Sequence, residues 1–308
     1  MSVACPFCTA DLKFNRSVQR PRELFACVEC FNPVIVESGS SGTTAVMVQG
    51  AHDTRGMLDD DSIAGRLLNN TRRRLDDLPI LPEMSHRIVA LCNDADASVH
   101  DLAKLVSEDP VVASRVIQVA NSAYYRGLSE IADITGACTR LGMRTVANTA
   151  QSIALNNVFR TSDERFSQTM QRLWRHSVAV AHLSSEIAIL LSIPHSETVY
   201  LMGLLHDIGK IALTHVAADE SNEATRPVRE NEELFNELLT RFHTLVGLHV
   251  ALKWNLPADL VVGIYYHHSA EAAPSENWRR LAHVVTLADA IAHVTNCPSE
   301  RTLDVSLI

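Results

Sequence analysis

The chain has 308 residues, of which 46% are hydrophobic and 20% charged, and its formal net charge is −9 at pH 7. This composition is typical of a soluble globular protein of one or two domains. The acidic balance disfavours nucleic-acid binding by the whole molecule, because such binding depends on neutralising phosphates. No apolar run reaches the ~18 residues of a membrane span and no secretory signal is visible, so we expect a cytoplasmic protein.

Residues 1–37 carry two Cys-x-x-Cys pairs, Cys5 with Cys8 and Cys27 with Cys30. Pairs at this spacing can place four thiolates in a tetrahedron around a structural Zn²⁺, which would supply most of the folding energy of so short a segment. A redox-active pair is the alternative, but it needs a single Cys-x-x-Cys on a βαβ unit. The segment resembles a zinc ribbon, and its near-neutral charge favours a protein contact over nucleic acid.

Residues 38–77 are predicted to be a linker with one short helix. The serine and glycine content of Ser38–Thr44 is typical of a flexible tether. Ile63–Leu75 has the pattern of a short helix. Its basic run Arg72–Arg74 is followed at once by Asp76 and Asp77, so we interpret it as a solvated helix face.

From residue 78 onward helical signals dominate. Ser98 with Asp101 predicts a helix N-terminus, and Asp109-Pro110 predicts a second one with proline at its first position. Few segments other than Val34–Val36 alternate like a strand. Apolar spacing predicts further helices at residues 134–141, 144–159, 168–191, 196–211, 230–240, 245–254, 257–266 and 277–294. The predicted fold class is all-α, a helical bundle over residues 78–308 after the small β module.

An imidazole and a carboxylate, His206 and Asp207, stand side by side at the end of an apolar helix. Such groups are costly to desolvate unless a charge meets them. Neutral imidazoles and carboxylates can hold a divalent cation that keeps open positions for water and a phosphate oxygen. Lys210, one turn later, is placed to meet a substrate phosphate. The candidate metal ligands in this part of the chain are His176, His206, Asp207, His243, His267, His268 and Asp289.

The order of these residues resembles the HD superfamily of metal-dependent phosphohydrolases. The more specific resemblance is to its HDOD branch, the HD-related output domain of bacterial signalling proteins. The matching segments are Leu78–Met84, Val106–Pro110, Val119–Tyr125, Thr135–Gly142, Trp174–Ser177, Gly203–Lys210 and Trp254–Pro257. The resemblance implies an all-helical domain in which His176, His206, Asp207 and Asp289 hold a metal. It further implies that His243, His267 and His268 complete a second site, bridged by Asp207.

The sequence also departs from the related cyclic-dinucleotide phosphodiesterases. Their Gly-Tyr-Pro signature after the double histidine is replaced by residues 269–274, Ser-Ala-Glu-Ala-Ala-Pro, and a glutamate ligand of some members is replaced by Arg172. Hydrolysis of cyclic dinucleotides is therefore disfavoured. Many HDOD domains are thought to act by binding rather than by catalysis.

The histidines also have simpler interpretations that involve no metal. His206 and Asp207 can order the core as a polar cluster without a metal, and His176 can form hydrogen bonds within the bundle. His267 and His268 point about 100° apart on a helix, so we expect at most one to face the site. The remaining late histidines match no motif and are predicted to be ordinary surface or core residues: His182, His215, His249, His283 and His293.

The leading functional hypothesis is a cytoplasmic bacterial signal-transduction protein. Its HDOD domain would bind signalling proteins or a small phosphate-containing ligand, with structural Zn²⁺ at the four cysteines and Fe, Mn, Mg or Zn at the HD site. The alternative is a metal-dependent phosphohydrolase acting on a nucleotide or phosphate ester, with Asp207 and Lys210 as catalytic residues. Nucleic-acid association through the cysteine module is a weaker third hypothesis.

Overall fold

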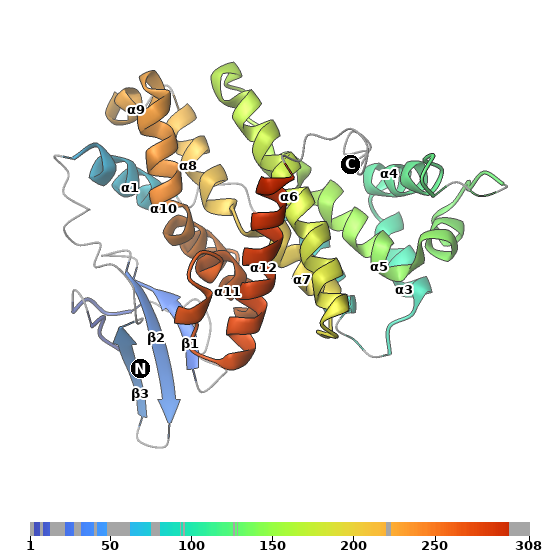
Figure 1. Ribbon diagram of the computed structural model, residues 1–308, viewed down its shortest axis with the longest axis horizontal. Helices are drawn as coiled ribbons and strands as arrows, with labels where there is room; N and C mark the ends of the chain where they lie inside the picture. The colour runs from blue at the N-terminus through green and yellow to red at the C-terminus, as the bar shows by residue number, and fades with distance from the viewer. Residues whose placement is uncertain are drawn as a thin grey trace. The chain divides into compact units, whose positions relative to one another are not determined.

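The computed structural model describes residues 3–6, 9–12, 22–27, 32–39, 42–47, 62–74, 81–92, 94, 96–125, 127, 129–219 and 223–295. Helices form most of this part of the chain, and one small sheet lies near its start (Figure 1). The predicted fold class is confirmed. The chain forms two compact units, the first made of Met1–Leu78, Thr161–Met170 and Leu205–Thr286, and the second of Pro79–Arg160, Gln171–Leu204 and Leu287–Ile308.

The sheet contains three antiparallel strands in the order β1 (Arg22–Ala26), β2 (Pro33–Gly39) and β3 (Gly42–Met47). The predicted strand at Val34–Val36 is confirmed, because these residues lie in β2 and pair with β1 and β3. Apolar side chains on one face form a small core with two cysteines: Val3, Cys5, Leu12, Phe25, Cys27, Val34 and Val36.

The predicted flexible tether at Ser38–Thr44 differs from the structure. Gly39 pairs with Gly42, and Ser38 pairs with Thr43, so most of this segment belongs to two paired strands. Serine and glycine are common in tight hairpin loops as well as in linkers. Composition alone therefore did not distinguish the two.

The helices of the first unit surround α8 (Ile208–Ala218) and α10 (Glu232–Lys253), which pack against each other. The predicted short helix after the sheet is confirmed as α1 (Ile63–Arg73), which packs on α8. An ion pair between Arg74 and Asp219 joins the C-terminal ends of α1 and α8. Strand β1 contacts α10 and α11 (Ala258–Tyr266). The remaining elements are η4 (Glu223–Thr225), α9 (Arg226–Glu230), η5 (Ala270–Ala272) and the first part of α12 (Glu276–Val294).

Gly209 allows α8 and α10 to approach closely. A Cβ atom at this position would lie 1.9 Å from the carbonyl oxygen of His243 and 2.6 Å from the backbone nitrogen of Gly247. Both neighbours are backbone atoms, which cannot rotate away as a side chain can. The absence of a side chain at residue 209 therefore determines how near the two helices lie.

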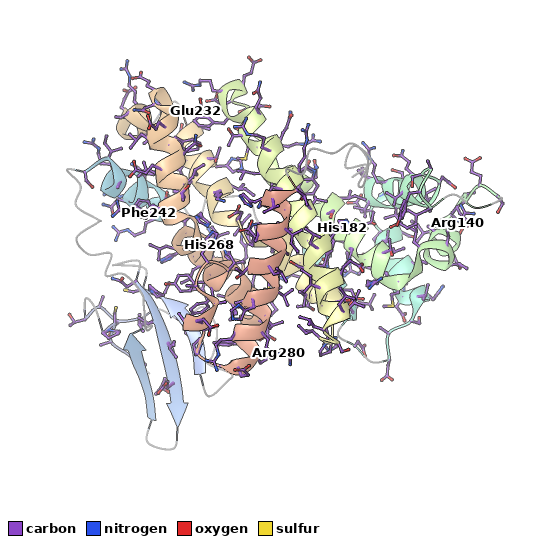
Figure 2. All side chains as sticks on the ribbon, in the orientation of Figure 1. Arg140, His182, Glu232, Phe242, His268 and Arg280 are labelled. Atoms are coloured by element: carbon purple, nitrogen blue, oxygen red, sulfur yellow. The ribbon has the colours of Figure 1, made fainter. Side chains whose placement is uncertain are left out.

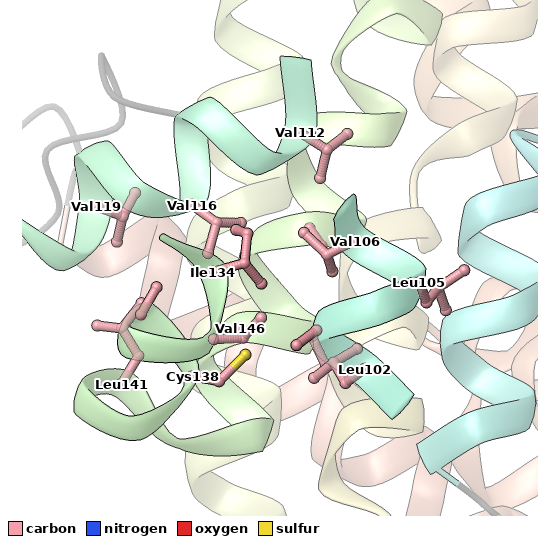
Figure 3. Close-up of a cluster of buried hydrophobic side chains, with 14 of the residues drawn as sticks. Leu102, Leu105, Val106, Val112, Val116, Val119, Ile134, Cys138, Leu141 and Val146 are labelled. Carbon is pink, nitrogen blue, oxygen red and sulfur yellow. The ribbon is translucent and has the colours of Figure 1, made fainter. Parts of the chain in front are cut away.

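The second unit is built on α2 (Glu83–Cys92), α3 (Val99–Ser107), α4 (Pro110–Ala120) and α5 (Ile134–Leu155). Their apolar faces meet in one core, drawn in Figure 3, to which Leu102, Val106 and Val116 contribute fully buried side chains. The second unit also holds η3 (Asn156–Phe159), most of α6 (Glu164–Leu190), α7 (Ser196–Leu205) up to Leu204, and the end of α12. No described helix is long and apolar enough to cross a bilayer.

The helix starts predicted from capping residues are confirmed. Ser98 and Asp101 form a reciprocal capping box at the start of α3. The side chain of Asp109 accepts hydrogen bonds from the first turn of α4, in which Pro110 is the first residue. Gly142 interrupts α5 with a positive φ of 78°, which agrees with the predicted break between residues 141 and 144.

Two predicted helix boundaries are wrong. The segment predicted as one helix over residues 196–211 is two helices, α7 and α8, separated by a turn at His206-Asp207. The segments predicted as separate helices at 230–240 and 245–254 are joined in α10. No proline or glycine lies between Arg241 and Leu245, so the helix continues without interruption.

Three polar side chains form a row of hydrogen bonds in the apolar interior of the second unit. The hydroxyl of Tyr200, which is fully buried, lies 2.6 Å from Ser152 Oγ and 3.3 Å from Nε2 of His182, which Figure 2 labels. Burial lowers the pKa of His182 to about 4 and raises that of Tyr200. His182 is therefore a neutral internal partner of Tyr200, which agrees with the prediction of an ordinary core or surface histidine.

We predict that Gly209→Ala lowers the free energy of unfolding by at least about 3 kcal/mol, the upper part of the usual range for overpacking. The new methyl group would meet backbone atoms of α10 and force the two helices apart. Chemical denaturation measures the change. Gly127→Ala is the control, because its Cβ would meet only the flexible guanidinium of Arg140 at 3.3 Å. Equal stability of the two variants would contradict the close packing of α8 on α10.

We predict that stability falls as the pH is lowered from about 6.5 to about 4, partly because of His182. In this window the unfolded chain binds a proton on the imidazole that the folded protein does not accept. The shift corresponds to roughly 3 kcal/mol at most. His182→Gln, which keeps a partner for Tyr200, should flatten the curve of unfolding free energy against pH, whereas His100→Gln on the exposed face of α3 should not. Parallel curves for the wild type and His182→Gln would contradict the assignment.

Candidate metal centre

The turn between α7 and α8 places a carboxylate inside the first unit. Asp207 is the residue before α8, with φ −99° and ψ 16°, and its side chain does not cap the helix. An aspartate at this position usually accepts a hydrogen bond from the first helical turn. Here the carboxylate accepts one from Lys210 instead, with Nζ 2.6 Å from Oδ2. Its other oxygen, Oδ1, faces the imidazoles of α10 and of the end of α11.

Two buried histidines converge on that oxygen. His243 Nε2 lies 3.6 Å from Asp207 Oδ1, and His267 Nε2 lies 3.9 Å from it. The two Nε2 atoms are 3.3 Å apart. His206 lies next to them, with Nε2 3.4 Å from Asp207 Oδ2 and its ring 5.0 Å from that of His267. All four side chains are at most 3% exposed.

The backbone determines which ring nitrogens carry hydrogen. His243 Nδ1 lies 3.0 Å from the carbonyl oxygen of Leu239 and 2.9 Å from that of Thr240, and His267 Nδ1 lies 2.9 Å from that of Ile264. A carbonyl oxygen only accepts, so Nδ1 of each ring is the donor. In neutral rings the lone pairs are then on the Nε2 atoms. A further bond from Thr286 Oγ1 to the His267 carbonyl, at 2.5 Å, ties that residue to α12.

This arrangement fits a cation. Two Nε2 lone pairs and a carboxylate oxygen face one another in a buried space, which is repulsive unless positive charge lies between them. Donors around one ion at ~2.1 Å are about 3.0–3.5 Å from each other, close to the separations found here. The described residues of the first unit can therefore hold a divalent metal ion between Asp207, His243 and His267.

The electrostatics agree with neutral imidazoles around an ionised carboxylate. Burial lowers the pKa of His243 to about 4 and lowers the pKa of His267 well below its ordinary value. Burial by itself would raise the pKa of Asp207. His206, Lys210 and His243 outweigh this effect and hold its pKa well below the usual range.

His267 and His268 lie on different sides, as predicted for adjacent residues. His267 is fully buried and faces Asp207, whereas His268, labelled in Figure 2, is exposed. The ring of His268 nevertheless lies 4.1 Å from that of His267 and 5.1 Å from that of His243. Donor atoms of the three rings are all within 4.8 Å of one another, so His268 is a candidate ligand on the outer side.

The second unit contains its own set of donors. His176 Nε2, on α6, lies 3.0 Å from Asp289 Oδ1 on α12. Nδ1 of His293, one turn after Asp289, lies 3.0 Å from the same oxygen. His293 was predicted to be an ordinary surface or core residue, because it matches no family motif. Its spacing of four residues from Asp289 was the available signal, since residues i and i+4 share a helix face.

The cysteine pairs are only partly described. Cys5 and Cys27 are each 1% exposed and lie in the same apolar cluster under the sheet. Cys8 and Cys30 lie outside the described residues. The burial of one cysteine from each pair in one cluster is compatible with a shared site, and the tetrahedral zinc site itself stays a prediction.

Comparison with known proteins identifies the family. The HDOD domain model matches residues 78–270, and the chain therefore belongs to the HDOD family. An "Uncharacterized protein" of Treponema pallidum (strain Nichols) is 25% identical over 207 residues. The match covers 66% of this chain but 40% of the relative, so the chain spans less than half the length of this relative.

Two solved structures are similar in fold. An HDOD domain protein of unknown function from Geobacter sulfurreducens has a TM-score of 0.60 and 25% identity, with 76% of this chain and 80% of that chain covered. A "Putative phosphohydrolase" from Shewanella amazonensis SB2B has a TM-score of 0.54 and 27% identity, with coverage of 74% and 81%. The helical body is thus of the HDOD type.

Proposed function

We propose that this protein is a cytoplasmic regulatory protein whose HDOD domain binds a divalent metal ion and, through it, a small phosphate-containing ligand or a signalling partner. The observation that carries the proposal is the convergence of the His243 and His267 Nε2 atoms on Asp207 Oδ1. A polar cluster that served only to order the core would need a donor between these acceptors. The metal-free alternative is therefore less well supported than a metal centre.

The proposed ligands in the first unit are Asp207, His243 and His267, with His206 and His268 beside them. The order of residues in the HD pattern also makes His176 and Asp289 candidate ligands, and these two lie together in the second unit. An imidazole-rich set favours Fe or Zn over Mg, which prefers oxygen ligands and retained water, and the carboxylate of Asp207 adds an oxygen ligand that Mn also accepts.

Lys210 has a distinct role in this proposal. Its ammonium group pairs with Asp207 Oδ2 and leaves Oδ1 directed at the two imidazoles. The side chain is 20% exposed, whereas Asp207 is 1% exposed, so Lys210 lies between the buried carboxylate and solvent. A bound cation would neutralise and polarise a phosphate group. Lys210 is placed to add a second positive charge there.

A phosphohydrolase is the second candidate. The pairing of Asp207 with Lys210 beside three histidines favours it, because phosphoryl transfer depends on concentrated positive charge. The similarity to the Shewanella amazonensis protein adds support. The missing Gly-Tyr-Pro signature disfavours cyclic dinucleotides as substrates. A nucleotide or simple phosphate ester is the substrate class of this candidate.

We also propose that the cysteine module binds a structural Zn²⁺ through Cys5, Cys8, Cys27 and Cys30. The spacing of the pairs and the burial of Cys5 and Cys27 in one small core support it. A module of about 37 residues can bury little surface by itself, and a metal would compensate for this. The module is proposed to contact a protein partner.

We predict that elemental analysis of the purified protein finds about one zinc at the cysteines and at least about one further transition metal at the histidines. Asp207→Asn should lose the second metal and keep the zinc, because it removes the central anionic ligand. Cys27→Ser should show the opposite pattern. His100→Ala, an exposed histidine on α3, is the matched control and should change neither. A wild-type protein that takes up no metal beyond zinc, even when Mn²⁺ and Fe²⁺ are supplied, would contradict the proposed centre.

We predict that nucleotides raise the melting temperature of the metal-loaded protein but are not hydrolysed. The binding should be lost in Lys210→Gln, which keeps the metal ligands, and after metal removal. Differential scanning fluorimetry and a phosphate-release assay over nucleotides, phosphate esters and cyclic dinucleotides measure the two properties. Turnover by the wild type that disappears in both Asp207→Asn and Lys210→Gln would replace the regulatory proposal with the enzymatic one.

A further inference from the structure

A groove of about 420 Å³ lies on the surface of the second unit, between α2 and α3. One side is formed by a row of residues from α2 and the turn that follows it, Arg87, Ala90, Leu91 and Asp94. The other side is formed by a row from α3 and its C-cap, Asp101, Lys104, Leu105 and Glu108. Both rows have the spacing i, i+3, i+4 and i+7, so each is a single helix face.

An ion pair fixes the direction of the two rows. Arg87, the first residue of the α2 row, pairs with Glu108, the last residue of the α3 row. Two guanidinium nitrogens contact the two carboxylate oxygens, with Nη2 2.8 Å from Oε1. The rows are therefore antiparallel, as expected for helices joined by a short loop. Asp94 and Asp101 lie at the opposite end of the groove from this neutral pair.

That opposite end carries negative charge. Asp94 accepts a hydrogen bond from the Asp96 backbone nitrogen at 3.0 Å, and Asp101 accepts two from Ser98, at 2.9 and 2.6 Å. The hydrogen bonds from Ser98 lower the pKa of Asp101, so its carboxylate is ionised at neutral pH. Within the part of the chain that the structure describes, neither carboxylate forms an ion pair. Lys104 is the one cation of the groove outside the Arg87 pair, so the carboxylates outnumber it.

The middle of the groove is apolar and open. Leu105, labelled in Figure 3, is 5% exposed and belongs to the core of the unit, and Leu91 packs against the same core. Ala90 is exposed, and its small side chain leaves free the space above these two leucines. A groove with an apolar floor between two helices is the kind of surface on which an amphipathic helix docks.

We propose that the α2–α3 groove is a docking site for a basic amphipathic helix of a partner protein. Aliphatic side chains of that helix would cover Leu91 and Leu105, and its lysine or arginine side chains would pair with Asp94 and Asp101. Charge complementarity selects this occupant. A second copy of this chain is disfavoured, because two chains with a net charge of −9 repel each other. The groove contains none of the candidate metal ligands, so it adds a protein contact that does not depend on the metal centre.

The test is binding of a fluorescent peptide to the full-length protein, followed by fluorescence anisotropy without added metal. The probe is a helical peptide of about four turns made of Leu, Lys and Ala, with leucines spaced i, i+3, i+4 and i+7. A second peptide, in which glutamate replaces every lysine, is the comparison. We expect the lysine peptide to bind and the glutamate peptide to bind much more weakly.

Three variants of the groove should change the affinity in different directions. Ala90→Trp fills the space above the leucines and should raise the dissociation constant of the lysine peptide at least about tenfold. Asp94→Asn keeps the acceptor for Asp96 and removes the charge, and it should raise the constant about two- to fivefold, as for an exposed ion pair. Lys104→Gln removes a repelling charge and should lower the constant.

Two variants serve as matched controls and should bind as the wild type does. Ala90→Ser keeps the groove open. Glu130→Gln removes one exposed carboxylate of the same unit that does not line the groove. Because residues 90, 94 and 130 are exposed, the melting temperatures of their variants should stay close to that of the wild type.

Wild-type affinity in Ala90→Trp, or equal weakening by Glu130→Gln and Asp94→Asn, would overturn the docking site, because the peptide would then be held only by the overall negative charge. Tighter binding of the glutamate peptide, with affinity lost in Lys104→Gln, would overturn the basic character of the partner. A wild-type dimer that becomes a monomer in Ala90→Trp, measured by light scattering, would show that a second copy occupies the groove instead.

Discussion

The central constraint in this protein is the buried carboxylate of Asp207, which lies beside imidazoles whose N–H groups donate to backbone carbonyls instead of to it. Nδ1 of His243 and of His267 donate to backbone carbonyls, so their Nε2 atoms face Asp207 with lone pairs. Lys210 neutralises one oxygen of Asp207 and leaves the other to the imidazoles. Such a group is unfavourable in a protein interior unless positive charge or a donated hydrogen meets it, and we propose that a divalent cation does so.

Two features of the first unit bring the side chains of this cluster together. A turn after α7 directs Asp207 inward rather than along α8, and the absence of a side chain at Gly209 lets α8 lie against the backbone of His243. The N-terminal segment packs on the same helices, because α1 contacts α8 and β1 contacts α10 and α11. Residues before position 78, where the HDOD match begins, therefore contact α8, α10 and α11, the helices next to Asp207, His243 and His267.

The sequence predicted the fold class, the HDOD relationship and most helices, because capping residues and apolar spacing are local signals. It did not predict the break at His206-Asp207, since no glycine or proline marks that position, and it divided α10 near Phe242 although no glycine or proline interrupts the helix there. It identified the residues of the cluster from their order, but not the hydrogen positions on the rings, which depend on backbone carbonyls one turn away. The position of His293 beside Asp289 was missed because no motif includes residue 293.

A crystal structure of the protein reconstituted with Mn²⁺, with anomalous scattering collected on both sides of the manganese edge, tests the account most directly. The account predicts an anomalous peak between Asp207 Oδ1 and the Nε2 atoms of His243 and His267, with Lys210 still on Oδ2. An ordered cluster with no peak, in which a protonated imidazole bridges to the carboxylate, would contradict it and leave these residues as a polar element of the core.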